Sequence, residues 1–215
     1  GLLTIADTTG PTDIATVDIS LDGPFLQNGA GGVSIAGDIA TTGNGSTDTI
    51  EFTGPVTLTG NVALDTGTGA NISFGDSATI DDGAGGPWDL QVDAPGATVS
   101  FGATSGAGNG RIGGAAGTNR IGDLTIVAAD TVTFNGEVFT TTLNQTAGTT
   151  LTTFNQAVDV AGDVTLTGQA FTINGGLTTT GTGSLTITNA GLLTIADTTG
   201  PTDIATVDIS LDGPF

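Results

Sequence analysis

The chain lacks most of the side chains that enzymes use for catalysis. Its 215 residues include no cysteine, histidine, methionine or tyrosine, and the only basic residues are Arg111 and Arg120. Covalent and acid–base catalysis rely mainly on histidine, cysteine and lysine, and two cations offer little to stabilise negative charge in a transition state. We therefore expect a protein that is not an enzyme, with no catalytic residues and no cofactor-binding site.

Positive charge is scarce, whereas negative charge is abundant. Twenty-two Asp and Glu residues and two Arg residues give a net charge of −20. Nucleic acids are bound through cationic contacts to phosphate, so this balance excludes a nucleic-acid partner and disfavours anionic lipid surfaces. No apolar run approaches the ~18 residues of a membrane-spanning helix, and we expect no membrane span in this segment.

Strong helix formers are also scarce, because glutamate occurs twice and lysine and methionine are missing. Val, Ile, Thr and Phe occur in short stretches between Gly, Asn and Asp, as strands and tight turns require. Residues 33–39, 56–64 and 163–168 place an apolar side chain at every second position. A chain with 37 glycines could instead be disordered. The period of two favours an ordered, all-β chain.

A long repeat dominates the organisation of the chain. Residues 1–25 recur letter for letter at 191–215, so 1–190 is one complete repeat and 191–215 is the start of the next. The composition is even and contains no linker, which indicates one continuous structure. Tandem arrays are typical of proteins that extend over distance, and we expect further protein beyond both ends.

A shorter period lies inside the long one. The segments TFNGEV (133–138), TFNQAV (153–158) and TINGGL (172–177) follow one another at 20 and 19 residues. That length suits one coil of a β-helix and predicts about 10 coils in 190 residues, or about 48 Å along the axis. A string of sandwich domains is the alternative, but the internal period favours the solenoid.

The short period also predicts which side chains stack on one another. Phe134, Phe154 and Ile173 should form a ladder inside the coil. The asparagines that follow them, at 135, 155 and 174, should form a second ladder at the next turn. Such ladders hold the register of stacked strands.

Residues 132–197 resemble the tandem repeats of giant bacterial surface proteins of the filamentous haemagglutinin-like and autotransporter-adhesin type. The resemblance implies a right-handed parallel β-helix, secretion, and a cell-surface or extracellular filament, and it supplies no catalytic residues. The Gly-rich stretch 102–122, which contains Arg111 and Arg120, departs from the pattern. We expect it to be a loop extruded from the coil, in which the two arginines bridge to carboxylates of a neighbouring coil or fibre, or have no partner.

Asp81, Asp82 and Asp89 lie close to Trp88, the single tryptophan. Paired carboxylates beside a sugar-stacking tryptophan are typical of some polysaccharide-cleaving enzymes. The simpler interpretation is a solvated acidic turn whose tryptophan covers the edge of the coil. We favour it, because adjacent residues of a strand point to opposite faces.

Calcium is the candidate cofactor. The carboxylates would lie within a Debye length of one another and repel, and carboxylate and carbonyl oxygens are preferred ligands of Ca²⁺. Residues 43–52, which include Asp48, partly match a Gly- and Asp-rich calcium motif. Asp81, Asp82 and Asp89 are the other candidate ligands. A diffuse layer of counterions is the favoured alternative.

Two further patterns suggest surface roles. Thr-x-Thr occurs at 57/59, 131/133, 165/167 and 186/188. Regular Thr ranks could bind ice, although β-branched Thr also suits the outer side of any strand. Asn44, Asn71 and Asn144 begin glycosylation motifs.

Together these observations predict a structural extracellular filament or cell-surface fibre of a bacterium, serving adhesion, a surface coat or a biofilm matrix. Its partners would be neighbouring repeats of itself, head to tail, together with lateral fibre contacts and surface glycans. A calcium-dependent matrix protein or glycan-binding module is the alternative. A polysaccharide-cleaving enzyme and an ice-binding protein are less favoured.

Overall fold

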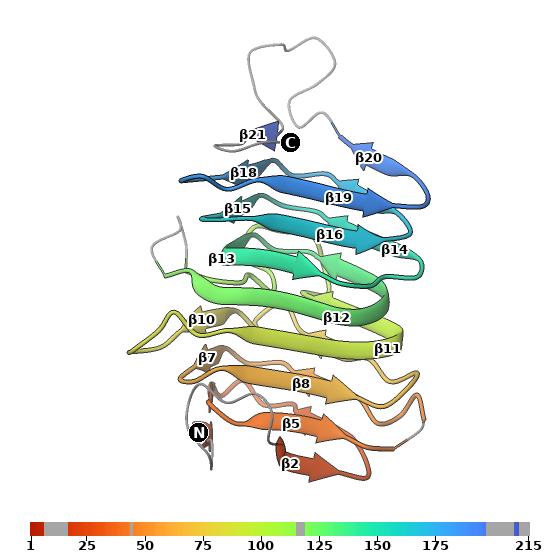
Figure 1. Ribbon diagram of the computed structural model, residues 1–215. Coiled ribbons are helices and arrows are strands. Elements are labelled where there is room, and N and C mark those ends of the chain that lie inside the picture. Colours follow the sequence, from red (N-terminus) through yellow and green to blue (C-terminus); the bar gives the residue numbers. More distant parts are fainter. Residues whose placement is uncertain (7–16, 44, 115–118, 197–208, 211–215) are drawn as a thin grey trace.

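The chain forms a parallel β-solenoid. The computed structural model describes residues 1–6, 17–43, 45–114, 119–196 and 209–210. Successive coils stack along one axis, and Figure 1 shows the chain climbing as a right-handed winding. The described residues contain strands and no helix, and therefore no helix that could cross a membrane. The predicted all-β, right-handed parallel β-helix is confirmed.

Short strands from successive coils stack into three faces. The first face contains β1 (Leu3–Ile5), β4 (Val33–Ile35), β7 (Val56–Leu58), β10 (Ile80–Asp82), the start of β13 (Val138–Gln145), β15 (Val158–Val160), β18 (Leu177–Thr179) and β21 (Ile209–Ser210). The second face contains β2 (Val17–Leu21), β5 (Asp38–Thr41), β8 (Val62–Thr66), the first parts of β11 (Leu90–Phe101) and β12 (Ile121–Phe134), the rest of β13, β16 (Val164–Gly168) and β19 (Leu185–Asn189). The third face contains β3 (Phe25–Gln27), β6 (Ile50–Phe52), β9 (Ile72–Phe74), the last parts of β11 and β12, β14 (Leu151–Phe154), β17 (Phe171–Ile173) and β20 (Leu193–Ile195).

The strands from β1 to β20 make eight coils, so the prediction of about 10 coils is too high. The spacing of 19 to 20 residues holds from Val138 through Val158 to Leu177, but 32 residues separate Ile80 from its partner Ile112 on the next coil. Corner loops differ in length because they lie outside the stacked strands and leave their register unchanged. Eight coils advance about 38 Å rather than 48 Å, at about 4.8 Å a coil.

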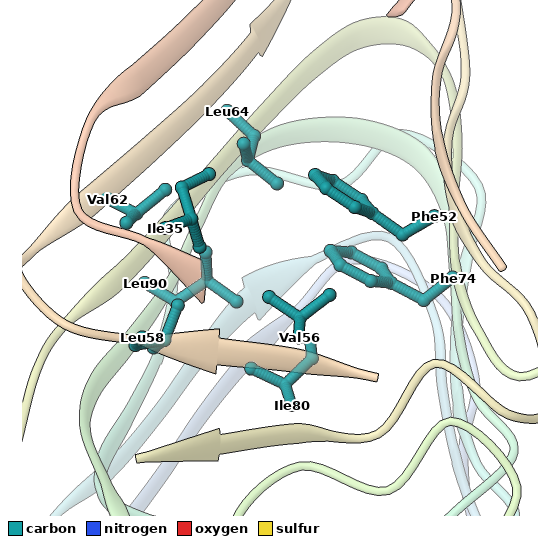
Figure 2. A pocket seen from close by; sticks show the side chains of 9 residues that line it. All are labelled: Ile35, Phe52, Val56, Leu58, Val62, Leu64, Phe74, Ile80 and Leu90. Carbon is teal, nitrogen blue, oxygen red and sulfur yellow. The ribbon is translucent and has the colours of Figure 1, made fainter. Parts of the chain in front are cut away.

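Inward side chains form the core, and aromatic rings run through it as a ladder. Phe134 and Phe154 stack at 4.7 Å between ring centroids, and Ile173 continues the column on the next coil. The predicted ladder is confirmed, and it extends down through Phe101 and Phe74. Figure 2 shows nine inward side chains of coils 2 to 4, which leave a gap of only about 10 Å³. An apolar gap of that size is part of a packed core rather than a ligand site.

The predicted asparagine ladder is also present. The Asn155 side-chain amide donates to the Asn135 side-chain oxygen at 2.8 Å, and Asn174 donates to Asn155 in the same way at 2.8 Å. Asn135 in turn donates to the Gly102 carbonyl one coil below. Coils 4 to 7 are therefore joined, each to the next, by a side-chain hydrogen bond at one corner.

The stretch 102–122 stays partly in the coil, so the expectation of a single extruded loop is wrong. Ile112 is fully buried and bridges Ile80 below to Val138 above on the first face. An excursion leaves the coil before it, whereas residues 115–118, which follow it, lie outside the described residues. At the base of this excursion, Gly102 and Gly110 have φ of 82° and 61°, and a Cβ on Gly110 would lie 2.0 Å from the Gly102 nitrogen. Only glycine fits such a close backbone crossing.

The two copies of the repeated segment lie on different faces. Leu3–Ile5 pairs with β4 on the first face, whereas the identical Leu193–Ile195 pairs with β17 on the third. The burial of the two copies also differs, since Ile5 is 6% exposed and Ile195 is 42% exposed. The neighbouring coil, and not the local sequence, decides which face this strand occupies.

Candidate functional site

The two adjacent aspartates singled out in the sequence have separate partners. Asp81 lies 3.7 Å from the Arg111 guanidinium on the next coil. Asp82 accepts a hydrogen bond from the Trp88 backbone N–H at 3.0 Å, and partial burial raises the pKa of its carboxyl. Trp88 packs against the core beside this turn. Asp81 thus contacts the next coil, whereas Asp82 closes the turn that precedes Trp88.

Asp89 and Asp48 also have structural roles. The Asp89 carboxylate accepts the Asp123 backbone N–H at 2.8 Å and so ties coil 4 to coil 5. Asp48 lies in a turn of coil 2, where its carbonyl accepts the Thr41 hydroxyl. Asp48 is therefore in a different coil from Asp81, Asp82 and Asp89. Among the described residues, no three acidic side chains are grouped so that they could share one metal ion.

Two other carboxylates form an unexpected pair. Asp65 and Asp93 are register partners on the second face, one coil apart. Partial desolvation raises the pKa of Asp65. Desolvation first, and then the charge of Asp65, raises the pKa of Asp93. One Asp93 oxygen is buried without a hydrogen-bond partner in the described part of the chain. Sequence reasoning missed the pair because 28 positions separate the two residues.

Other carboxylates are stabilised in their charged form by bonds between coils. Asp76 accepts the backbone N–H groups of Ala103 and Thr104 and the Thr104 hydroxyl, all within 2.9 Å. Asp163 accepts the backbone N–H and hydroxyl of Ser184. These hydrogen bonds lower the pKa of both carboxyls. Much of the acidic charge therefore contributes to coil stacking.

Both arginines bridge to carboxylates of other coils, as one of the two expectations had it. Arg120 lies 2.8 Å from the Asp159 carboxylate, two coils further on. It also donates to the Asp159 and Thr140 carbonyls. Arg111 makes the longer contact to Asp81 and donates to the Gly113 carbonyl. Both ion pairs lie along the first face.

The third face carries a continuous row of small hydroxyl side chains, which we call the hydroxyl strip. Its members are outward-facing register partners in six consecutive coils: Ser73, Ser100, Thr133, Thr153, Thr172 and Thr194. All six are half-buried. Among the described residues, none of their hydroxyls bonds to another protein group. The strip therefore keeps its full hydrogen-bonding capacity for water or a partner.

The hydroxyl strip differs from its surroundings in charge and in the use of its hydroxyls. Glu51, one coil below Ser73, is the acidic residue in the same row. Elsewhere, threonine hydroxyls close turns, as Thr66 does by donating to the Ala70 carbonyl at 2.7 Å. The sequence contains these serines and threonines, but their alignment depends on the lengths of the loops between them.

The Thr-x-Thr pairs lie on all three faces. Thr165 and Thr167 lie in register with Thr186 and Thr188 on the second face. The pair at 131/133 is on the third face, and Thr57 is on the first.

An open groove of about 410 Å³, lined by small neutral side chains, follows the corner between the second and third faces beside Thr167 and Thr188.

The glycosylation motifs differ in accessibility. Asn71 is exposed, and its side-chain oxygen accepts the Thr98 backbone N–H at 2.9 Å. Asn144 is half-buried on the second face. Asn44 lies outside the described residues.

Comparison with known proteins gives no relative from which a function could be inferred, so the functional argument starts from the stacked coils. No protein-family model, curated protein or solved structure matches this chain.

Proposed function

We propose that this chain is part of a structural filament, an extracellular or cell-surface fibre of a bacterium that serves adhesion, a surface coat or a biofilm matrix. The observation that carries the proposal is the state of the two outermost coils. The inward side chains Leu3 and Ile195 are 41% and 42% exposed, whereas their register partners Val33 and Ile173 are 1% and 0% exposed. Within the described part of the chain, Val33 and Ile173 have a coil on each side, whereas Leu3 and Ile195 have a coil on one side only. Ile5, the other inward residue of β1, is 6% exposed, so the opening at the first coil is centred on Leu3.

The repeat supplies a matching coil for each exposed end. A hollow lined by Leu185, Ile187 and Leu193 opens at the last coil, and strand edges there carry backbone groups able to pair with a further strand. Because the core of each solenoid coil packs against the coils directly above and below it, the core can continue indefinitely as copies are added. The copies would stack head to tail as a stiff rod.

The polar side chains support the same interpretation. The asparagine ladder, the Asp76 and Asp163 carboxylates and Arg120 all connect one coil to another. These polar and charged side chains therefore hold the coils together along the solenoid axis. Weak contacts made by the hydroxyl strip would recur in every repeat, and repetition converts weak contacts into avidity.

The test is electron cryo-microscopy of fibres formed by the full tandem protein. A filament predicts an unbroken rod with a layer line near 4.8 Å from stacked strands. Separate beads joined by flexible segments would overturn the proposal and favour independent binding modules. A rod that loosens on chelation at constant ionic strength would favour the calcium-dependent matrix protein instead.

A further inference from the structure

The identical segments 1–25 and 191–215 show how far one repeat advances along the solenoid. The strand Leu3–Ile5 is the first strand of coil 1, and its copy Leu193–Ile195 is the third strand of coil 8. From the first strand of one coil to the third strand of the coil seven turns later, the advance is seven and two-thirds coils.

A second strand pair gives the same advance independently. Ile19 and Ser20 pair with β5 on the second face of coil 1. Their copies Ile209 and Ser210 pair with β18 on the first face, at the start of coil 9. This advance is again seven and two-thirds coils. Two strands with separate partners would agree in this way if the whole segment shifts as a unit.

We propose that successive copies of the repeat join with an offset of seven and two-thirds coils, so that each copy is rotated about a third of a turn against the one before it. The proposal builds on the filament function above. Its docking surface is the upper edge of β17 and β18, and the partner is the start of the next copy of this sequence.

The physical basis is that either face can accept the segment. Parallel pairing uses backbone groups alone, and the inward Leu and Ile of Leu193–Ile195 lie over Phe171 and Ile173 as Leu3 and Ile5 lie beside Val33 and Ile35. The face that the segment occupies is then set by the face of the strand that precedes it. The strand before Leu193 is β19 on the second face, so the third face comes next.

The rotation distributes each surface feature around the fibre. The hydroxyl strip lies on the third face here, would lie on the second face in the next repeat, and on the first face in the one after. Three repeats make 23 coils, or about 110 Å at about 4.8 Å a coil. A filament of this symmetry offers the strip to partners on every side, including neighbouring filaments.

Paired cysteines test the junction in the chain itself, which has no native cysteine. Thr172 and Thr194 are outward register partners on the third face, and parallel neighbours lie at a Cα separation that permits a disulfide. The variant Thr172→Cys/Thr194→Cys should close fully on mild oxidation. A repeat of whole coils would instead place residue 194 over Thr178 of the first face, so Thr178→Cys/Thr194→Cys is the matched control and should stay open. Closure of the control, of both variants or of neither would overturn the proposal.

Helical reconstruction of the fibres then measures the rotation directly. The expected result is a rise of about 37 Å per repeat with a rotation of about a third of a turn beyond any gradual twist of the solenoid. A rise of about 38 Å without that rotation would overturn the inference and leave the filament function intact. Beads on a string would overturn the filament function, while the cysteine variants would still report on the junction.

Discussion

The rings of Phe134 and Phe154 stack 4.7 Å apart and 4° from parallel, although 20 residues separate them in the sequence. Each ring also touches a further inward side chain, Phe101 below and Ile173 above. The column is therefore continuous through the middle of the solenoid.

Truncating the column should be costly in its middle and cheaper at its lower end. Phe134→Ala removes a fully buried ring and should lower the free energy of unfolding by about 3–5 kcal/mol. Phe25 is half-buried and tilted 47° against Phe52, so Phe25→Ala should cost less than half as much. Urea unfolding followed by circular dichroism measures both. Equal losses would contradict a core that is tighter in the inner coils.

Asn155 should contribute through both of its hydrogen bonds. Asn155→Ala removes the donor to Asn135 and the acceptor of Asn174, and leaves the buried Asn135 oxygen without its partner. We expect a loss of about 1–3 kcal/mol. Asn144→Ala is the control, because that half-buried asparagine has no side-chain hydrogen bond to the described residues, and it should change stability by no more than about 0.5 kcal/mol. Similar losses from both variants would show that the hydrogen bonds of the asparagine ladder do not contribute to stability.

Asp93 and Asp76 should have opposite effects on stability as pH changes. Desolvation and Asp65 raise the pKa of Asp93, so its charged form destabilises the fold above the folded pKa, and that penalty disappears as pH falls. Asp93→Asn should therefore raise the melting temperature at pH 7 and have little effect below the ordinary carboxyl pKa of 3.8.

Asp76 provides the matched comparison. Hydrogen bonds from Thr104 lower the pKa of Asp76, so the stability it contributes is present above pH 3.8 and is lost as pH falls through the lowered pKa. Asp76→Asn should lower the melting temperature at pH 7 and lose its effect in acid. Melting curves of both variants from pH 2 to 7 decide the matter, and effects of the same sign would refute this assignment.

The two arginines should differ in their contribution. Arg120 contacts a carboxylate at 2.8 Å and carbonyls of two further coils, and one Asp159 oxygen is buried. Arg120→Ala should cost about 1–3 kcal/mol, since it leaves a partly buried carboxylate without its cation. Arg111 lies 3.7 Å from Asp81, and Arg111→Ala should cost less than about 1 kcal/mol. The same urea titration compares them, and a larger loss at Arg111 would reverse the ranking.

Added salt should stabilise the chain without selectivity among ions. The net charge of −20 makes self-repulsion large, and screening by any cation reduces it. Calcium chloride and sodium chloride at equal ionic strength should raise the melting temperature by similar amounts in differential scanning calorimetry. Saturable stabilisation at micromolar calcium would instead demonstrate a defined site, and Asp81→Asn, Asp82→Asn and Asp89→Asn would then locate it.

Local pattern was enough to predict the ladders. Phe134, Phe154 and Ile173 follow one another at nearly constant spacing, as do the asparagines after them, because no loop between these coils is long. Where loops lengthen, as between Ile80 and Ile112, the period disappears from the sequence although the side chains still stack. The number of coils was overestimated for that reason, and the Asp65–Asp93 pair and the hydroxyl strip were missed.

The sequence by itself determined the all-β class, the alternation of inward apolar and outward polar residues, and the stacking of coils, because a period of two and a recurring coil length are local properties of the chain. Only the tertiary structure decided which face each strand occupies. Leu3–Ile5 and Leu193–Ile195 have the same residues and lie on different faces. The reason is that parallel backbone pairing accepts any suitable strand, so the edge offered by the preceding coil determines where it lies.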